Sequence, residues 1–396
     1  MLVLALLAAA VAGGDLRAAE SPPGRASRGS LVAEGAGLFH TKGCDQCHAA
    51  SASGEKPVGP ELVGGRSWRD VMQFSGSLWN HIPRMLDTMR ERGIDRPAMS
   101  RDDMEKLVEY IFYASFLDAP GDAQRGRTLF EQRSCARCHQ VGGRGGTNGP
   151  RLDELGPYAT SIFMAQALWN HGPGMAAKVK ELGLEWPRLE DEDLSNLLAF
   201  IRGKDTPPAS IERIAAECGN PRSGKTLFEA RGCRGCHAVD GDGDKTGPDL
   251  GSHHRWRSFA EMAGGLWNHA PAMWAKMRER GLPYISVSES EMADIMAYLY
   301  YVQFTAAEGD VTRGDRLFVE KTCAGCHAAG KGGQDVGPDL AGSEATRSSV
   351  DWASAMWNHA PKMEATLRES GIAWPRFEDD EMRDLVAFLR SRRGAK

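Results

Sequence analysis

A five-residue pattern, Cys-x-x-Cys-His, occurs four times in this 396-residue sequence and constrains its fold more than any other feature. The first cysteine of each copy lies at position 44, 135, 233 or 323, so the copies are 91, 98 and 90 residues apart. Self-similarity at a nearly constant period indicates a chain built from repeated structural units. The sequence therefore predicts four small units of similar fold instead of one large domain.

The spacing inside each copy indicates its chemistry. Two thiols one helical turn apart can each form a thioether with one vinyl group of a flat macrocycle, and the adjacent imidazole then lies beneath its iron. A redox dithiol does not require the histidine, and a zinc ion needs four ligands, which one copy does not supply. We therefore expect four covalently bound haem c groups. The thioether cysteines are Cys44, Cys47, Cys135, Cys138, Cys233, Cys236, Cys323 and Cys326, and the proximal iron ligands are His48, His139, His237 and His327.

The longer middle step of the repeat coincides with residues 203 to 222, which contain Pro207, Pro208 and Pro221. A proline-rich stretch of this kind is typical of a linker. We place it between two tandem pairs of units. The expected segments are a signal peptide (1–12), a flexible leader (13–30), unit 1 (31–119), unit 2 (120–203), the linker (204–221), unit 3 (222–308) and unit 4 (309–396).

The N-terminus predicts export. Residues 2 to 12 are an apolar run that ends in the small-x-small pattern of a cleavage site, and the run is too short to span a bilayer as a permanent helix. We therefore expect a periplasmic or otherwise exported protein with no transmembrane segment after cleavage. Cys218 is the one cysteine outside the motifs, and we expect it either to be buried and inert or to crosslink to a partner.

The charge of the chain limits its partners. The formal net charge is −5, which provides no basic field for nucleic acid. The propionates of bound haem would add negative charge, so a partner would dock through a basic surface. We expect redox partner proteins of unknown identity, and docking to a membrane complex stays open.

Three further patterns recur in every unit. A Gly-x-x-Leu-Phe segment precedes the cysteines, a Gly-Pro-x-Leu segment follows the histidine, and an apolar stripe with helical spacing closes the unit. These glycines are Gly35, Gly126, Gly224 and Gly314, then Gly59, Gly149, Gly247 and Gly337. The closing stripes are Met104, Leu107, Val108 and Ile111; Leu194, Leu197, Leu198 and Ile201; Met292, Ile295, Met296 and Leu299; and Met382, Leu385, Val386 and Leu389.

Together these patterns resemble the class I cytochrome c family in each of the four units. The resemblance implies an all-α fold of four tandem class I cytochrome c-like haem domains, here in two pairs. In each domain the first and last helices would pack together around one haem. It also implies that the proline carbonyls hold the proximal histidines, at Pro60, Pro150, Pro248 and Pro338.

The sequence departs from this family at the sixth iron ligand. Class I domains take a methionine from the loop before the last helix, but here only unit 1 has one, Met99. Another source is the repeated segment Trp-Asn-His-x-Pro-x-Met, in which the histidine and the methionine share one helical stripe. We favour the methionines as distal ligands, because thioether ligation raises the potential for electron transfer. They are Met85, Met175, Met273 and Met363, and the alternative ligands, or hydrogen-bonding neighbours, are His81, His171, His269 and His359.

The tryptophans of this segment, Trp79, Trp169, Trp267 and Trp357, are expected to hydrogen-bond a propionate or to pack in the core. All four units carry the same candidate ligands and none is marked as reactive, so we assign no catalytic residue. We expect an electron carrier rather than an enzyme, one that passes single electrons between partners in a respiratory or related chain. The alternative is a haem enzyme subunit, a small-molecule oxidoreductase with one displaceable axial ligand. The histidines outside the repeat, His40, His253 and His254, are predicted to be exposed.

Overall fold

A computed structural model of the chain describes residues 28–48, 58–60, 62, 68–116, 118, 121–203, 219–251, 256–304, 308–330, 336–341 and 343–393. The expected signal peptide, most of the leader, linker residues 204–218 with Cys218, and the pair His253-His254 lie outside these ranges. Within them, no helix combines the length and the apolar character that crossing a membrane requires.

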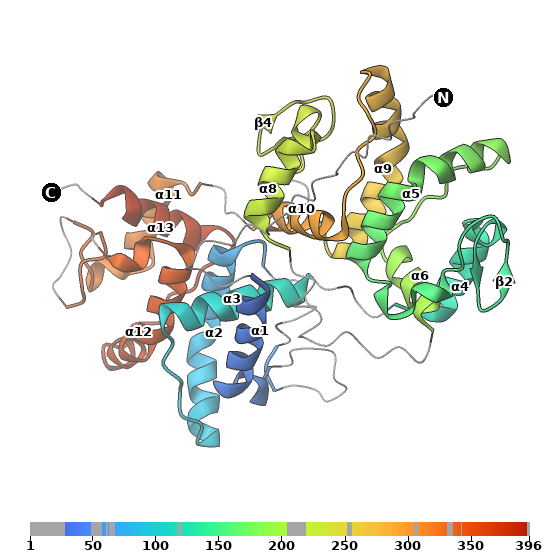
Figure 1. The fold of residues 1–396 in the computed structure, drawn as a ribbon. Coiled ribbons are helices and arrows are strands. Elements are labelled where there is room, and N and C mark those ends of the chain that lie inside the picture. The colour runs from blue at the N-terminus through green and yellow to red at the C-terminus, as the bar shows by residue number, and fades with distance from the viewer. Residues whose placement is uncertain are drawn as a thin grey trace, which may run out of the picture.

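Each unit is built from three helices and a short turn, so the predicted all-α fold is confirmed (Figure 1). An opening helix leads into a 3-10 turn at the cysteines, and a long helix and a closing helix follow. Unit 1 contains α1 (Arg28–Thr41), η1 (Cys44–Gln46), α2 (Val71–Arg92) and α3 (Arg101–Ser115), and unit 2 contains α4 (Ala123–Gln132), η2 (Cys135–Arg137), α5 (Ser161–Glu181) and α6 (Asp193–Arg202). Unit 3 contains α8 (Pro221–Ala230), η4 (Cys233–Gly235), α9 (Phe259–Glu279) and α10 (Glu289–Val302), and unit 4 contains α11 (Val311–Glu320), η5 (Cys323–Gly325), α12 (Ser349–Glu369) and α13 (Glu381–Ser391).

Short elements complete the units. Two 3-10 turns, η3 (Asp153–Tyr158) and η6 (Glu344–Thr346), precede α5 and α12. After the cysteines, units 2 and 3 each form a two-stranded antiparallel hairpin. Its strands are β1 (Gln140–Val141) and β2 (Arg144–Gly145) in unit 2, and β3 (Ala238–Val239) and β4 (Asp242–Gly243) in unit 3.

The opening and closing helices of each unit pack together at the glycine of the Gly-x-x-Leu-Phe segment. A Cβ atom added at Gly126 would lie 1.9 Å from the carbonyl oxygen of Asn196 on α6. Four residues later, the ring of Phe130 lies 5.6 Å from that of Phe200, measured between centroids. The glycine therefore permits a close helix crossing and the aromatic pair fills the space beside it. The other three units repeat this contact.

The closing helices bury the predicted stripes. All sixteen side chains named above for these stripes are less than 9% exposed, because each closing helix packs against the opening helix of its own unit and the long helix of the paired unit. Local capping sets where the helices begin. Ser288 and Glu291 form a capping box at the start of α10, and Ser100 and Asp103 form one at the start of α3.

The long helices join the units in two pairs. α2 packs against α12, and α5 packs against α9. In Figure 1 the helices of units 1 and 4 lie together on the left, and α5 lies beside α9 on the right. Unit 1 is therefore paired with unit 4, and unit 2 with unit 3. The sequence did not predict which units pack together, because a linker indicates the path of the chain and not which helix faces are complementary.

The Trp-Asn dipeptide before each motif histidine fixes these pair interfaces. In unit 3, the indole Nε1 of Trp267 donates to the carbonyl of Pro187 in unit 2 at 2.6 Å. The Asn268 side chain donates to the carbonyl of Leu189 at 2.5 Å and accepts from its N–H at 2.8 Å. Equivalent bonds join Trp169-Asn170 to residues 285–287, Trp79-Asn80 to residues 375–377, and Trp357-Asn358 to residues 97–99.

For three of the tryptophans, burial and these bonds favour core packing over a bond to a propionate. The side chains of Trp79, Trp267 and Trp357 are buried, as packing residues are, but their N–H groups bind the backbone of the paired unit. Each indole N–H therefore already has an acceptor, so none of the three serves as a propionate donor in this arrangement.

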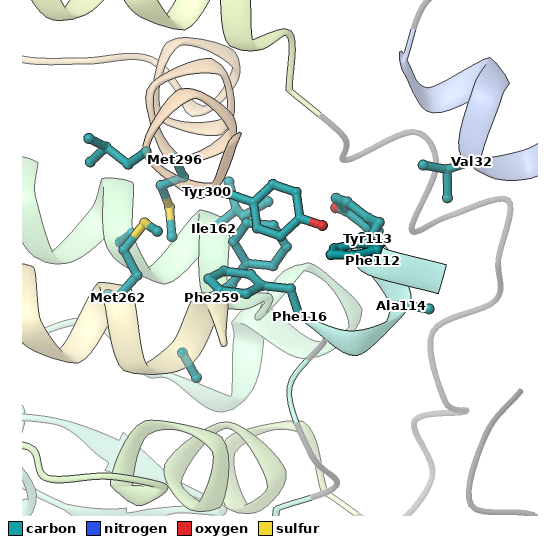
Figure 2. Close-up of a cluster of buried hydrophobic side chains, with 14 of the residues drawn as sticks. Val32, Phe112, Tyr113, Ala114, Phe116, Ile162, Phe259, Met262, Met296 and Tyr300 are labelled. Carbon is teal, nitrogen blue, oxygen red and sulfur yellow. The ribbon is translucent and has the colours of Figure 1, made fainter. Parts of the chain in front are cut away.

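An aromatic cluster links the two pairs to each other (Figure 2). Phe116, at the end of α3, lies 4.8 Å from Phe259 of α9 and 4.7 Å from Tyr300 of α10, measured between ring centroids. The ring centroids of Phe112 and Phe304 lie 5.0 Å apart. These residues come from units 1 and 3. They belong to one continuous core that also contains residues of unit 2 and, from unit 4, Ala353 and Trp357.

Candidate functional site

The Cys-x-x-Cys-His segment forms the same turn in all four units. The residue before the first cysteine has a left-handed backbone, with φ of 72° at Gly43, 62° at Ser134, 77° at Gly232 and 64° at Thr322. A 3-10 turn follows, and the histidine N–H donates to the carbonyl of the first cysteine at 2.9 Å in each unit. Both thiols and the imidazole are therefore attached to one short, closed segment.

The Gly-Pro-x-Leu segment is bound to this turn at two points. Its glycine N–H donates to the carbonyl of the second cysteine at 2.7 Å in units 1, 3 and 4 and at 2.8 Å in unit 2. Its proline carbonyl accepts from the histidine Nδ1, at 2.9 Å for His48 and His237 and at 3.0 Å for His139 and His327. Because a carbonyl can only accept, Nδ1 carries the proton and Nε2 keeps its lone pair for a metal.

The glycine of this segment is required by the closeness of the histidine ring. A Cβ atom added at Gly247 would lie 2.5 Å from Cε1 of His237, and one at Gly149 would lie equally close to His139. Gly59 and Gly337 are in the same position beside His48 and His327. The loop therefore lies directly on the imidazole face, and any side chain at this point would displace the ring.

The first thiol of each turn is held in its neutral form. Burial raises the pKa of Cys44, Cys135, Cys233 and Cys323 to about 11. A reactive dithiol or a zinc site instead has a lowered thiol pKa. Among the described residues, no three His, Cys, Asp or Glu side chains are grouped so that they could hold a metal ion by themselves. The raised thiol pKa disfavours the redox-dithiol alternative.

In unit 1 a cavity of about 730 Å³ opens against the turn. Cys44, Cys47 and His48 lie on one wall, and His81 and Met85 of α2 line it as well. Most of the remaining lining is aliphatic or aromatic. Cofactor pockets typically measure about 300–1,000 Å³ and have such a lining with a few polar groups, so the cavity suits a large apolar cofactor.

Trp68 gives an independent indication of what the cavity holds. Its side chain lines the cavity, and its indole Nε1 is buried with no hydrogen-bond partner in the described part of the chain. A buried N–H without an acceptor costs about 1–3 kcal/mol. A haem propionate would supply that acceptor, so the residues present fit a haem.

The histidine of the long helix lies opposite the proximal histidine. The ring centroids of His48 and His81 are 6.0 Å apart. The corresponding distance is 6.1 Å between His237 and His269 in unit 3, and 6.1 Å between His327 and His359 in unit 4. Burial, and then the neighbouring proximal imidazole, lowers the pKa of His81, His269 and His359, so these rings are neutral at neutral pH.

The motif methionines lie one helical turn further along the long helices. All four, Met85, Met175, Met273 and Met363, are half-buried. Met85 and Met175 pack against the main core and Met363 against a second cluster in units 1 and 4. Met99, the one methionine at the family's usual ligand position, is buried, and its backbone is bound to Asn358 of unit 4.

Two other observations concern residues singled out by the sequence. His40 is exposed and contacts Asp45 at 2.5 Å, as an ordinary surface histidine does. The binding of Trp-Asn to a second unit was not predicted. The available signal was the recurrence of this dipeptide in every unit, always directly before the histidine.

Comparison with known proteins agrees with this geometry. The family model of cytochrome c matches residues 123–204, 222–303 and 311–393, which together make up more than half of the chain. Over 201 residues the chain is 27% identical to the cytochrome bc1 complex cytochrome c subunit of Corynebacterium diphtheriae, covering 45% of this chain and 68% of that protein. Over 115 residues it is 28% identical to cytochrome c oxidase subunit 2 of Alkalihalophilus pseudofirmus, covering 26% of this chain and 32% of that protein. No solved structure gives a significant match.

The matched stretches contain the turns of units 2, 3 and 4, each with its Gly-Pro-x-Leu segment. Cytochrome c domains bind haem c covalently, with the histidine of this turn on the iron. The fold, the turn geometry and the family match therefore lead to one conclusion: this chain belongs to the cytochrome c family.

Proposed function

We propose that this chain is an exported tetrahaem cytochrome c that passes single electrons between redox partner proteins. The observation that carries the proposal is one site repeated four times: a closed Cys-x-x-Cys-His turn whose imidazole donates to a proline carbonyl at 2.9–3.0 Å. We propose four haem domains, with the boundaries expected from the sequence: 31–119, 120–203, 222–308 and 309–396. The eight motif cysteines would form the thioethers, and His48, His139, His237 and His327 would bind the irons.

Unit 1 supports a count of four rather than three. Its residues lie outside the stretches that match the family model, but its turn has the same bonds as the other three. Its cavity presents both thiols, the proximal histidine and an indole that lacks an acceptor. The residues that would hold a haem are therefore as complete here as in units 2, 3 and 4.

The sameness of the units supports electron transfer over catalysis. A haem supplies a one-electron couple, and the protein sets its potential through ligands, burial and charge. In each unit the turn provides the proximal side and the long helix covers the other. Such closure keeps the ligand geometry nearly unchanged between oxidation states. In the sequence, all four units carry the same candidate ligands.

The relatives support a respiratory role. One is named as part of a bc1 complex and the other as a subunit of cytochrome c oxidase. Partners in a respiratory or related chain would therefore donate electrons to this protein and accept them from it. The net charge of −5 favours partners with a basic docking surface, and haem c attachment favours a location outside the cytoplasmic membrane.

Intact mass and absorbance of the exported protein test the proposal. We expect four haem groups per chain, and three in the double variant Cys44→Ala, Cys47→Ala. The matched control, Cys218→Ser, removes the ninth cysteine and should keep four. Fewer than four in the wild-type protein would contradict the tetrahaem assignment, and rapid binding of carbon monoxide by the reduced protein would contradict closed irons and favour an enzyme.

A further inference from the structure

We infer that in units 1, 3 and 4 the sixth ligand of the haem iron is the histidine of the long helix, His81, His269 or His359. The methionine one turn further on, which the sequence favoured, then forms part of the apolar wall. This assignment rests on the proposed haem attachment and deepens it, because it names the residue that closes each site.

The first support is the distance between the two imidazoles. When two histidine nitrogens bind a metal ion from opposite sides through bonds of about 2 Å, the ring centroids lie about 6 Å apart. The observed separations are 6.0 Å in unit 1 and 6.1 Å in units 3 and 4. The three long helices differ in most of their other residues, so three equal distances indicate a shared requirement and not the packing of one unit.

The second support is the direction of the proximal ring. In unit 3, Nδ1 of His237 donates a hydrogen bond to the carbonyl of Pro248, so Nε2 is the nitrogen that remains free to bind a metal. The glycine of the same loop covers one face of the ring. The imidazole of His269 lies across from the His237 ring at the distance given above. An iron between the two rings would therefore find one imidazole on each side.

The third support is the place of the methionine on the helix. Four residues of α-helix span about 6 Å along its axis. If His81 lies opposite His48, then Met85 is displaced by about that length from the line that joins the two rings. Met85 packs against the main core and Met363 against the second cluster, as filling side chains do.

In units 3 and 4 the loop before the closing helix is not an alternative source. In unit 1 this loop carries Met99, which lines the cavity, and there the 6.0 Å separation of the His48 and His81 rings is what favours the histidine. In units 3 and 4 the side chains at this point are Ile285 and Phe377, neither of which can bind a metal. The histidine is therefore the residue that geometry and chemistry both favour.

Unit 3 offers a direct test in the full-length, haem-loaded protein. Near-infrared magnetic circular dichroism and paramagnetic resonance of the oxidised protein report the axial ligands, and a potentiometric titration reports the haem potentials. His269→Met should add a methionine-to-iron band near the red edge of the visible spectrum and raise the potential of one haem, because thioether ligation raises it. Met273→Leu, the matched control, should keep the axial-ligand bands of the wild-type protein.

The opposite pattern overturns the inference. This pattern is a methionine-type band that disappears in Met273→Leu, or a His269→Met spectrum identical to wild type. The haem count of each variant, from its intact mass, separates this result from a failure of the proposed function. Four haems with methionine ligation in unit 3 would contradict the ligand assignment alone, whereas missing haems would contradict the tetrahaem proposal.

Discussion

The glycine before each proline determines how the proximal imidazole is held. At Gly247, the N–H binds the carbonyl of Cys236 while the missing side chain leaves space for the ring of His237. Glycine is used here for close approach and not for an unusual backbone conformation, since its φ is not positive. The sequence indicated a turn at this point, but only the contact with the ring explains why the residue has no side chain.

Gly247→Ala should destabilise unit 3. Its Cβ would lie 2.5 Å from Cε1 of His237, so either the ring or the loop must shift. Forcing one extra carbon into a packed site costs about 1–3 kcal/mol. Thermal unfolding should show a lowered midpoint for this variant. Gly235→Ala is the control, because a Cβ at that position meets nothing within 4 Å. Equal midpoints for the two variants would show that the loop accommodates the extra carbon without a loss of stability.

Among the helices, the long one combines two functions on different faces. Consecutive residues are turned by about 100°, so Trp267 and His269 project to nearly opposite sides of α9. One side binds the backbone of unit 2, and the other faces the proximal histidine of unit 3. The pair interface therefore fixes the same helix that carries the inferred ligand, which couples the position of the ligand to the contact with the paired unit.

Asn268→Ala should weaken the pair of units 2 and 3. The variant loses two bonds to Leu189 and leaves a backbone N–H and a carbonyl without those partners. We expect a loss of about 2 kcal/mol, which denaturant unfolding can measure as a lowered midpoint. Lys276→Ala on the same helix is the control: its partner Glu279 lies on the same exposed face, so the cost should be below about 0.5 kcal/mol. If both variants behave alike, the dipeptide does not stabilise the interface.

At the scale of the whole molecule, Asp118 connects three units. It follows α3 of unit 1, accepts a hydrogen bond from Ser161 at the start of α5, and accepts another from the N–H of Ala260 in α9 at 2.6 Å. Enclosure between these elements raises the pKa of Asp118, although its hydrogen bonds and the charge of Arg202 oppose the shift. The protonated form of Asp118 is therefore more favoured than that of a solvent-exposed aspartate.

The stability of the junction should depend on pH through Asp118. A raised pKa means that the folded protein keeps this proton after the unfolded chain has lost it, so stability falls as pH rises above the ordinary aspartate value towards the raised one. Asp118→Asn removes the titration. The unfolding temperature of the variant, relative to that of the wild-type protein, should therefore increase from acid towards neutral pH. If the unfolding temperature of the wild-type protein instead increases relative to that of the variant as pH rises, the raised pKa of Asp118 is contradicted.

Asp122→Asn is a control for the side-chain change itself. Asp122 caps the start of α4 by accepting from the N–H groups of Gln124 and Arg125. Asparagine caps a helix about as well as aspartate. Its unfolding temperature should therefore stay close to that of the wild-type protein, and a large change would show that amide substitution is itself disruptive in this chain.

The sequence by itself determined the content of each unit. The motif turn, the Gly-Pro-x-Leu segment and the helical stripes are all specified within about 90 residues, and local periodicity and steric rules are enough to predict them. The buried stripe of α10 and the capping box at Ser288 are examples that the structure confirms.

Only the tertiary structure decided how the units pair and which imidazole lies opposite which. The bonds that join Asn80 to Phe377 and Asn268 to Leu189 connect residues that are 297 and 79 positions apart. Such contacts depend on the shape of two folded surfaces, and shape complementarity leaves no periodic pattern in a sequence. For the same reason, the stripe shared by His81 and Met85 could not distinguish them, and the inferred ligand rests on a tertiary observation, the distance from His81 to His48.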